Sequence, residues 1–278
     1  QLGSNIAVTA RWVYYKNSAV CFSDCLFIIE ITNQKGMFYK GVLILSFNDR
    51  TIMAMGEEKY NKIANHHVLL IGVGGVGGAV FECLVRFGIK NISIIDYDTV
   101  DETNLNRQLI SSVESIGKLK VDVAKARRRR INPNITVNAY NMFVDRDNLD
   151  FIKDLGADYI IDAFDTVKAK LSLIEFCHKN NMKIISAMGT GGRFSVDGFT
   201  IDTIDKTAGN GCGLSRVMRT ELRKRGITDH MCLFNKYPPE SKTTKDGNGR
   251  HAPGSTPFAP NIAGIMLAQY VCEQFAEE

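Results

Sequence analysis

The chain has 278 residues, of which 45% are hydrophobic and 23% are charged, and its formal net charge is +4. This composition excludes a disordered or fibrous protein and suits one globular domain with a substantial core. The small positive charge permits a nucleic-acid partner without requiring one. No apolar run approaches the ~18 residues that a membrane-spanning helix needs, so we expect no membrane association.

The seven cysteines form no Cys-x-x-Cys pair and no regular framework. The sequence therefore indicates neither a disulfide scaffold nor a structural zinc site. This cysteine usage is typical of a reducing compartment, and we expect a cytoplasmic protein.

Residues 1–36 begin without methionine and hold no clear helical or strand period. They could be a leader, a small extra strand pair, or sequence upstream of the enzyme. No small-residue cleavage site follows a charged segment, which disfavours secretion. We treat residues 1–36 as an uncertain N-terminal extension, with Met37 as a plausible start and residues 37–278 as a single domain.

Strands and helices are expected to alternate in the middle of the chain. The apolar run 68–71 enters a glycine-rich segment, and the helical pattern over 79–87 ends at Gly88, a favourable residue after a helix. Further strands are expected at 92–95, 136–140, 159–162 and 183–186, and further helices at 117–131, 147–155 and 167–180. This alternation predicts an α/β fold of Rossmann-like type, with a mostly parallel sheet covered by helices on both faces.

The pattern changes after the nucleotide-binding core that we expect at about 66–190. We expect strands within 194–204, a basic helix at 214–225, a polar loop at 237–257 and an amphipathic helix at 261–275. Residues 191–278 are therefore interpreted as substrate-side and C-terminal elements.

The glycine-rich segment 72–78, GVGGVGG, lies directly after a strand and before a helix. Backbone amides and the helix N-terminus can then face a phosphate group. Asp96, at the end of the next strand, lies where an acidic residue binds a ribose. A glycine motif alone is a weak signal, and at this point both NAD and ATP are possible ligands.

Two cationic residues follow the predicted ribose-binding acid. Arg107 lies in the segment NLNRQ (104–108), and Lys120 lies in GKLK (117–120). A dehydrogenase needs no fixed cations there, whereas a triphosphate that loses pyrophosphate needs its developing charge neutralised. Arg107 and Lys120 could each instead be an ordinary surface charge. For Lys118, the other lysine of the GKLK segment, a surface charge is the better interpretation.

Two carboxylates follow the strand at 159–162, where the carboxyl edge of the sheet is expected. Magnesium bound to phosphate oxygens is expected at such an edge. Asp165 is the better magnesium ligand, because Asp162 could equally be a structural hydrogen-bond acceptor.

Five motifs in order, GVGGVGG, IIDYDTV, NLNRQ, GKLK and DAFDT, resemble the superfamily of ubiquitin-activating-like enzymes, which adenylate carboxylates on a Rossmann-like core. The resemblance covers about 47–185 and implies ATP and Mg²⁺ as cofactors. It assigns nucleotide contacts to Gly72, Gly74, Gly75, Gly77, Asn104 and Gln108, ribose to Asp96, phosphates to Arg107 and Lys120, and magnesium to Asp165.

In homodimeric members of that superfamily, an arginine of the N-terminal helix reaches the ATP of the neighbouring subunit. Arg50 lies where that arginine would be expected. The resemblance therefore implies a homodimer with a composite site. A helix-surface arginine is the alternative interpretation of Arg50.

The last third of the chain closely resembles tRNA threonylcarbamoyladenosine dehydratases. The matching segments are SAMGTG (186–191), DKT (205–207), the basic stretch 217–226 and PGS (253–255), with Phe258 and Pro260. The resemblance implies ATP-dependent activation of the threonyl carboxylate on a modified adenosine in a tRNA anticodon loop. Ring closure then releases AMP, with net loss of water and without a catalytic cysteine.

A tRNA partner would need a positive surface. Arg216, Arg219 and Arg223 recur at helical spacing and could contact successive phosphates. A charged surface helix balanced by Glu221 is the alternative.

Two other functions stay open: activation of a small sulfur-carrier protein, and an inactive nucleotide-binding or sulfur-relay scaffold. Cys212, a lone cysteine without an evident base, is better interpreted as non-catalytic. Sulfur-transfer proteins nevertheless stay possible partners.

Overall fold

The computed structural model describes residues 7–14, 25–32, 38–44, 46–241, 244–245 and 251–278. For the described residues before 45, and for 244–245 and 251–252, it describes the backbone only. The chain divides into two compact units, Gln1–Tyr60 and Asn61–Glu278. The expected boundary after residue 36 falls inside the first unit, and the assignment of residues 37–278 to one domain stays a prediction.

The first unit contains an antiparallel sheet in the order β1-β2-β3. Its strands are β1 (Ala7–Tyr14), β2 (Cys25–Thr32) and β3 (Phe38–Ile44). Helix α1 (Asp49–Met55) follows, and α2 (Glu57–Ala64) leads into the second unit. Within residues 1–36 the structure forms the strand pair that was one of the possibilities considered, β1 and β2, and β3 adds a third strand after Met37.

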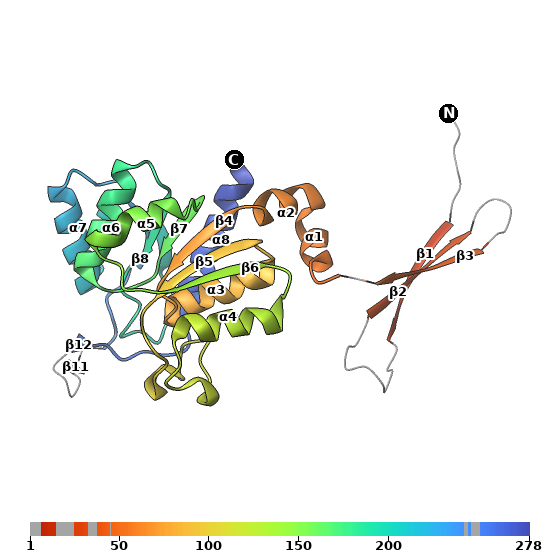
Figure 1. Ribbon diagram of the computed structural model, residues 1–278, viewed down its shortest axis with the longest axis horizontal. Coiled ribbons are helices and arrows are strands. Elements are labelled where there is room, and N and C mark those ends of the chain that lie inside the picture. Colours follow the sequence, from red (N-terminus) through yellow and green to blue (C-terminus); the bar gives the residue numbers. More distant parts are fainter. Residues whose placement is uncertain (1–6, 15–24, 33–37, 45, 242–243, 246–250) are drawn as a thin grey trace. The chain divides into compact units, whose positions relative to one another are not determined.

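The second unit is built on a seven-stranded sheet in the order β6-β5-β4-β7-β8-β10-β9 (Figure 1). Its strands are β4 (His67–Ile71), β5 (Asn91–Asp96), β6 (Thr136–Asn141), β7 (Tyr159–Asp162), β8 (Ile184–Ala187), β9 (Phe199–Thr203) and β10 (Met231–Asn235). All neighbouring pairs are parallel except β9 with β10. The predicted Rossmann-like α/β fold is confirmed.

Helices cover both faces of this sheet. On one face lie α3 (Gly75–Phe87), α4 (Lys120–Ile131) and α8 (Ala259–Glu277); on the other lie α5 (Leu149–Asp154), α6 (Val167–Lys179) and α7 (Gly213–Lys224) (Figure 1). Short 3₁₀ helices occur at Glu102–Asn104, Val113–Ser115, Arg146–Asn148 and Ile204–Thr207, and β11 (Thr244–Lys245) pairs with β12 (His251–Ala252). One apolar cluster fills the space between the sheet and α5, α6 and α7, and α3 and α8 bury a further set of apolar side chains on the other face.

Two expected element boundaries were wrong. Helix α4 begins at Lys120 rather than at residue 117, because Gly117 and Lys118 exchange backbone hydrogen bonds with Val100 instead of entering the helix. In the stretch 194–204, only Phe199–Thr203 forms a strand. The backbone amides of Phe194 and Ser195 donate instead to the Glu240 carboxylate, so a side chain rather than a neighbouring strand satisfies them.

None of the helices in the described part of the chain is long and apolar enough to cross a membrane. Among the described side chains, the five cysteines are free and no group of three or more His, Cys, Asp or Glu residues could hold a metal ion.

Candidate nucleotide site

The glycine-rich turn joins β4 to α3, and close packing explains its residues. Gly72 has φ of +89°, and a Cβ there would lie 2.9 Å from the carbonyl carbon of Ala163. A Cβ on Gly77 would lie 1.8 Å from the carbonyl oxygen of Gly72. Both positions therefore need glycine. The first amides of α3 have no acceptor within the helix, so this end of the helix can bind an anion.

Helix α8 packs against the same turn. A Cβ on Gly75 would lie 3.2 Å from the Pro260 side chain, and one on Gly264 would lie 2.3 Å from the carbonyl oxygen of Val76. The Asn261 amide donates to the Arg107 carbonyl at 3.2 Å. The C-terminal helix thus supports the turn. This contact was not predicted from the sequence. The four-residue spacing of Pro260 and Gly264, which places both on one face of a helix, is the pattern that could have indicated it.

Asp96, the predicted ribose-binding residue, ends β5 and is buried. One of its carboxylate oxygens accepts the backbone amide of Val73 at 2.7 Å, and the other accepts that of Asp98 at 2.8 Å. Burial raises the pKa of Asp96. The two hydrogen bonds favour the charged form and therefore lower the pKa, but the effect of burial is larger. Asp96 therefore braces the glycine turn. Its contact with a ribose stays a prediction.

The two predicted phosphate-binding cations have different surroundings. Lys120 is buried, and its Nζ lies 2.8 Å from an Oδ of Asp98, two residues beyond Asp96. Arg107 is half-buried, with its guanidinium donating to the Thr103 carbonyl at 2.8 Å, and its Cγ would lie 3.7 Å from a Cβ on Gly75. Both side chains thus flank the turn and its supporting acid.

Two of the three amide residues of the NLNRQ motif, Asn104 and Gln108, are buried beside this site. Asn104 accepts the backbone amide of Asp101 at 3.1 Å and fixes the local 3₁₀ turn. The Gln108 Nε2 would lie 3.8 Å from a Cβ on Gly74, and its buried Oε1 has no hydrogen-bond partner among the described residues. The unpartnered Oε1 can accept a hydrogen bond from a ligand hydroxyl or amino group, whereas the Nε2 is the Gln108 atom nearest the turn.

The loop after β7 separates the two carboxylates of the DAFDT motif. Asp162 is fully buried and forms an ion pair with the equally buried Lys170 at 2.6 Å, so the structural interpretation of Asp162 is the correct one. Ser186 donates to Asp162 at 2.6 Å and also contacts His230, whose pKa burial lowers to about 3. Asp165 is exposed, on the loop that packs against Gly72.

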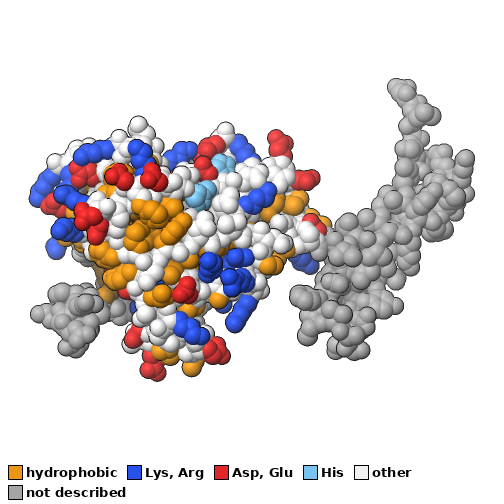
Figure 2. Space-filling model, in the orientation of Figure 1, with side chains coloured by type: hydrophobic (Ala, Val, Ile, Leu, Met, Phe, Trp, Pro, Cys, Tyr) orange, Lys and Arg blue, Asp and Glu red, His pale blue; other side chains and the backbone are white. Residues whose placement is uncertain are grey.

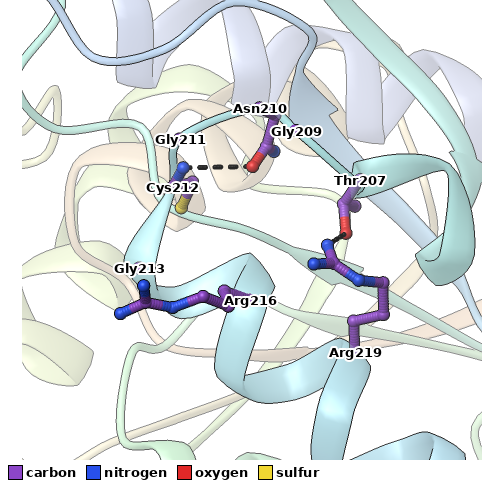
Figure 3. A pocket seen from close by; sticks show the side chains of 8 residues that line it. All are labelled: Thr207, Gly209, Asn210, Gly211, Cys212, Gly213, Arg216 and Arg219. Carbon is purple, nitrogen blue, oxygen red and sulfur yellow. Dashed lines mark hydrogen bonds between the residues drawn. The ribbon is translucent and has the colours of Figure 1, made fainter.

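A separate pocket of about 300 Å³ lies at the N-terminus of α7 (Figure 3). Two of the three arginines predicted to bind tRNA, Arg216 and Arg219, line it, and Arg219 donates to the Thr207 hydroxyl at 2.8 Å. Arg223 lies outside the pocket and pairs with Asp205 at 2.8 Å. Lysine and arginine side chains gather over α7, interleaved with acidic ones (Figure 2).

Arg50 is exposed on α1 in the first unit, so its predicted role in a neighbouring subunit's site stays a prediction. The other predicted nucleotide-site residues meet at the carboxyl ends of β4, β5 and β7 in the second unit.

The glycine turn, the buried acid beneath it and the flanking cations define a Rossmann-like nucleotide-binding protein. The chain belongs to the ThiF family, whose model matches residues 48–273.

Two named relatives make the similarity more specific. The tRNA threonylcarbamoyladenosine dehydratase of Bacillus subtilis is 36% identical over 234 residues, which are 80% of this chain and 91% of that protein. The tRNA N6-threonylcarbamoyladenosine dehydratase of Escherichia coli has been solved in complex with ATP; it is 26% identical, with a TM-score of 0.75 over 84% of this chain and 98% of that one. The structure of the same Escherichia coli enzyme with AMP is 27% identical in sequence, with a TM-score of 0.75 over 82% of this chain and 93% of that one. The resemblance to these dehydratases is confirmed.

Proposed function

We propose that this chain catalyses ATP-dependent dehydration of threonylcarbamoyladenosine in tRNA and acts in the cytoplasm. The observation that carries the proposal is the match to the Bacillus subtilis dehydratase over 91% of that enzyme's length. The glycine turn, with the cations Arg107 and Lys120 beside it, supports ATP as the activating nucleotide.

The chemistry is activation followed by ring closure. The carboxylate oxygen of the threonyl group attacks the α-phosphorus of ATP, the bond to the β-phosphate oxygen breaks, and pyrophosphate leaves. A nucleophile within the same substrate then attacks the activated carbonyl carbon and releases AMP, so one water is lost overall. Arg107 and Lys120 flank the turn and would neutralise the charge that develops on the phosphates.

Asp165 fits a magnesium-binding role. Its exposed carboxylate lies on the loop against Gly72, and Mg²⁺ is commonly held by one or two carboxylates together with substrate phosphates and water. The ion would offset the charge of the leaving pyrophosphate. Asp162 is unsuited to this role because Lys170 and Ser186 already occupy its oxygens.

The deciding experiment incubates the full chain with ATP, Mg²⁺ and tRNA carrying the threonylcarbamoyl group. Mass spectrometry of the nucleosides should show the loss of one water, with one AMP and one pyrophosphate released per turnover. A parallel reaction offers a small sulfur-carrier protein that ends in diglycine. Intact tRNA nucleosides together with adenylation of that carrier would refute the proposed substrate and favour the sulfur-carrier alternative.

We also propose a homodimer in which Arg50 completes the partner's site. Arg50→Ala and Asp165→Ala should each reduce dehydration at least a hundredfold, the scale of losing one preorganised electrostatic contact. Mixing equal amounts of the two inactive variants should restore up to about a quarter of the wild-type rate if subunits exchange at random. About half of the dimers are then mixed, and one of the two sites in each mixed dimer has both an intact Asp165 and an intact Arg50 from the other subunit. Mass spectrometry of intact complexes would verify that mixed dimers form. No recovery in verified mixed dimers would show that Arg50 does not act across subunits.

A further inference from the structure

Phe194 and Phe258 form an exposed aromatic pair. Their side chains are 67% and 49% exposed, and their rings meet edge to face with centroids 5.6 Å apart. The two residues come from distant parts of the sequence, so the fold brings them together. Large aromatic side chains held together in water, rather than scattered singly, suggest a binding surface.

The pair lies beside the nucleotide site. The Thr256 hydroxyl donates to the Arg193 carbonyl at 3.2 Å and accepts the Phe258 amide at 3.4 Å, which ties the two phenylalanine segments together. Two residues after Phe258, Pro260 packs against Gly75 of the glycine turn. Phe258 therefore lies within one helical turn of the residue that packs on the glycine turn, which brings the aromatic pair to the side of the nucleotide site where α8 begins.

The same segments lead to the arginine pocket. Arg193, which is only 4% exposed, donates to the Pro238 carbonyl at 3.1 Å. Pro238 in turn packs on the pocket wall, since a Cβ on Gly211 would lie 2.7 Å from it. Two nitrogens of the buried Arg193 guanidinium have no hydrogen-bond partner among the described residues. A continuous strip of packed residues thus joins the glycine turn, the aromatic pair and the pocket of Arg216 and Arg219.

We propose that Phe194 and Phe258 form a stacking platform for a nucleobase of the RNA substrate, with a backbone phosphate of the same RNA bound between Arg216 and Arg219. This inference rests on the proposed function, because it concerns how the modified nucleotide reaches ATP. Proteins recognise unpaired RNA bases by stacking them on aromatic rings and bind the backbone with cations. The order along the strip matches the substrate: a carboxylate at the turn, a base on the aromatic pair and a phosphate at the arginines.

The test compares Phe194→Ala, Phe258→Ala and the double variant with wild type. We expect each single change to raise the KM for modified tRNA about tenfold, within the range of base stacking, while the Kd for ATP stays unchanged. Phe258→Trp should retain most of the affinity, because a larger aromatic ring still stacks. Arg216→Ala should weaken binding and reduce its dependence on salt. Circular dichroism and ATP binding would show that each variant is folded.

Phe151 offers a matched control. It is 37% exposed on α5 and forms its own edge-to-face pair with Tyr140, with centroids 5.2 Å apart. Phe151→Ala removes a similar aromatic surface outside the strip, and it should leave the KM for tRNA unchanged. An equal rise in KM for Phe151→Ala and Phe258→Ala would indicate a nonspecific effect and overturn the platform.

A direct readout separates this inference from the proposed function. An RNA hairpin with 2-aminopurine in its loop should lose fluorescence on binding the wild type, and less so on binding the double variant. If the wild type is active but the double variant keeps the wild-type KM for tRNA and quenches the probe equally, the platform is overturned and the proposed function stands. An inactive wild type that still quenches the probe through the two phenylalanines refutes the dehydration but supports the platform. Binding of a diglycine-ended peptide, rather than RNA, through both phenylalanines would also overturn it.

Discussion

Gly77→Ala is expected to abolish ATP binding, with a Kd raised at least a hundredfold. The added methyl carbon would lie 1.8 Å from the carbonyl oxygen of Gly72, far inside any real contact distance, so the glycine turn must open. Opening the turn displaces the N-terminal amides of α3 and also Val73, whose amide donates to Asp96. Isothermal titration calorimetry with ATP in Mg²⁺ buffer would measure the loss.

Gly78→Ala is the matched control for this change. Gly78 is the next residue in the same helix, and its Cβ would meet only ordinary contacts, the nearest being the backbone nitrogen of Leu109 at 3.7 Å. Alanine is favoured over glycine in a helix by roughly 0.5–1 kcal/mol, so this variant should bind ATP normally and unfold at slightly higher temperature. Equal loss of ATP binding in both variants would contradict the packing explanation.

Local signals were sufficient to predict strands β4 to β8 of the second unit, whereas no strand was predicted where the buried strand β10 lies. The short apolar run before the glycines must form a strand buried on both faces, and Gly88 ends α3 in the left-handed conformation expected after a helix, with φ of +98°. The motif residues around the glycine turn follow from the same logic, because the carboxyl ends of neighbouring parallel strands meet at one edge.

Contacts between distant segments could not be predicted in this way. The packing of Pro260 on Gly75, and the meeting of Phe194 with Phe258, depend on where α8 returns along the sheet, which no local pattern encodes. The start of α4 was misplaced for a similar reason, since Gly117 pairs with Val100 across a loop. The sequence suggested two possible roles for Asp162, and only the fold reveals Lys170 as its partner.

Lys170→Met is expected to destabilise the chain by about 3–5 kcal/mol at neutral pH, the cost of breaking a buried ion pair. Lys170 and Asp162 are both fully buried, with the ammonium 2.6 Å from the carboxylate and 5.1 Å from the centre of the Phe164 ring. Without Lys170, the described groups that remain to stabilise the charged carboxylate are Ser186 and the loop backbone. The variant must then either bury an unpaired charge or bind a proton as it folds.

The pH dependence of that loss identifies its cause. Burial already raises the pKa of Asp162, and removing Lys170, which lowers it, must raise it further above the unfolded value of about 3.9. For a raised carboxyl pKa, stability is fully present below the unfolded pKa and is lost as pH rises toward the folded pKa. Urea unfolding should therefore show a smaller deficit at pH 4.5 than at pH 7.5.

Two further variants test whether an unpaired charge is responsible. Adding Asp162→Asn to Lys170→Met removes both charges and should recover much of the stability, because the remaining core holds no uncompensated ion. Lys179→Met, on the same helix, removes a lysine that is exposed and paired with Glu175, so it should have little effect. A deficit that is independent of pH and persists in the double variant would instead point to lost packing around the Lys170 side chain.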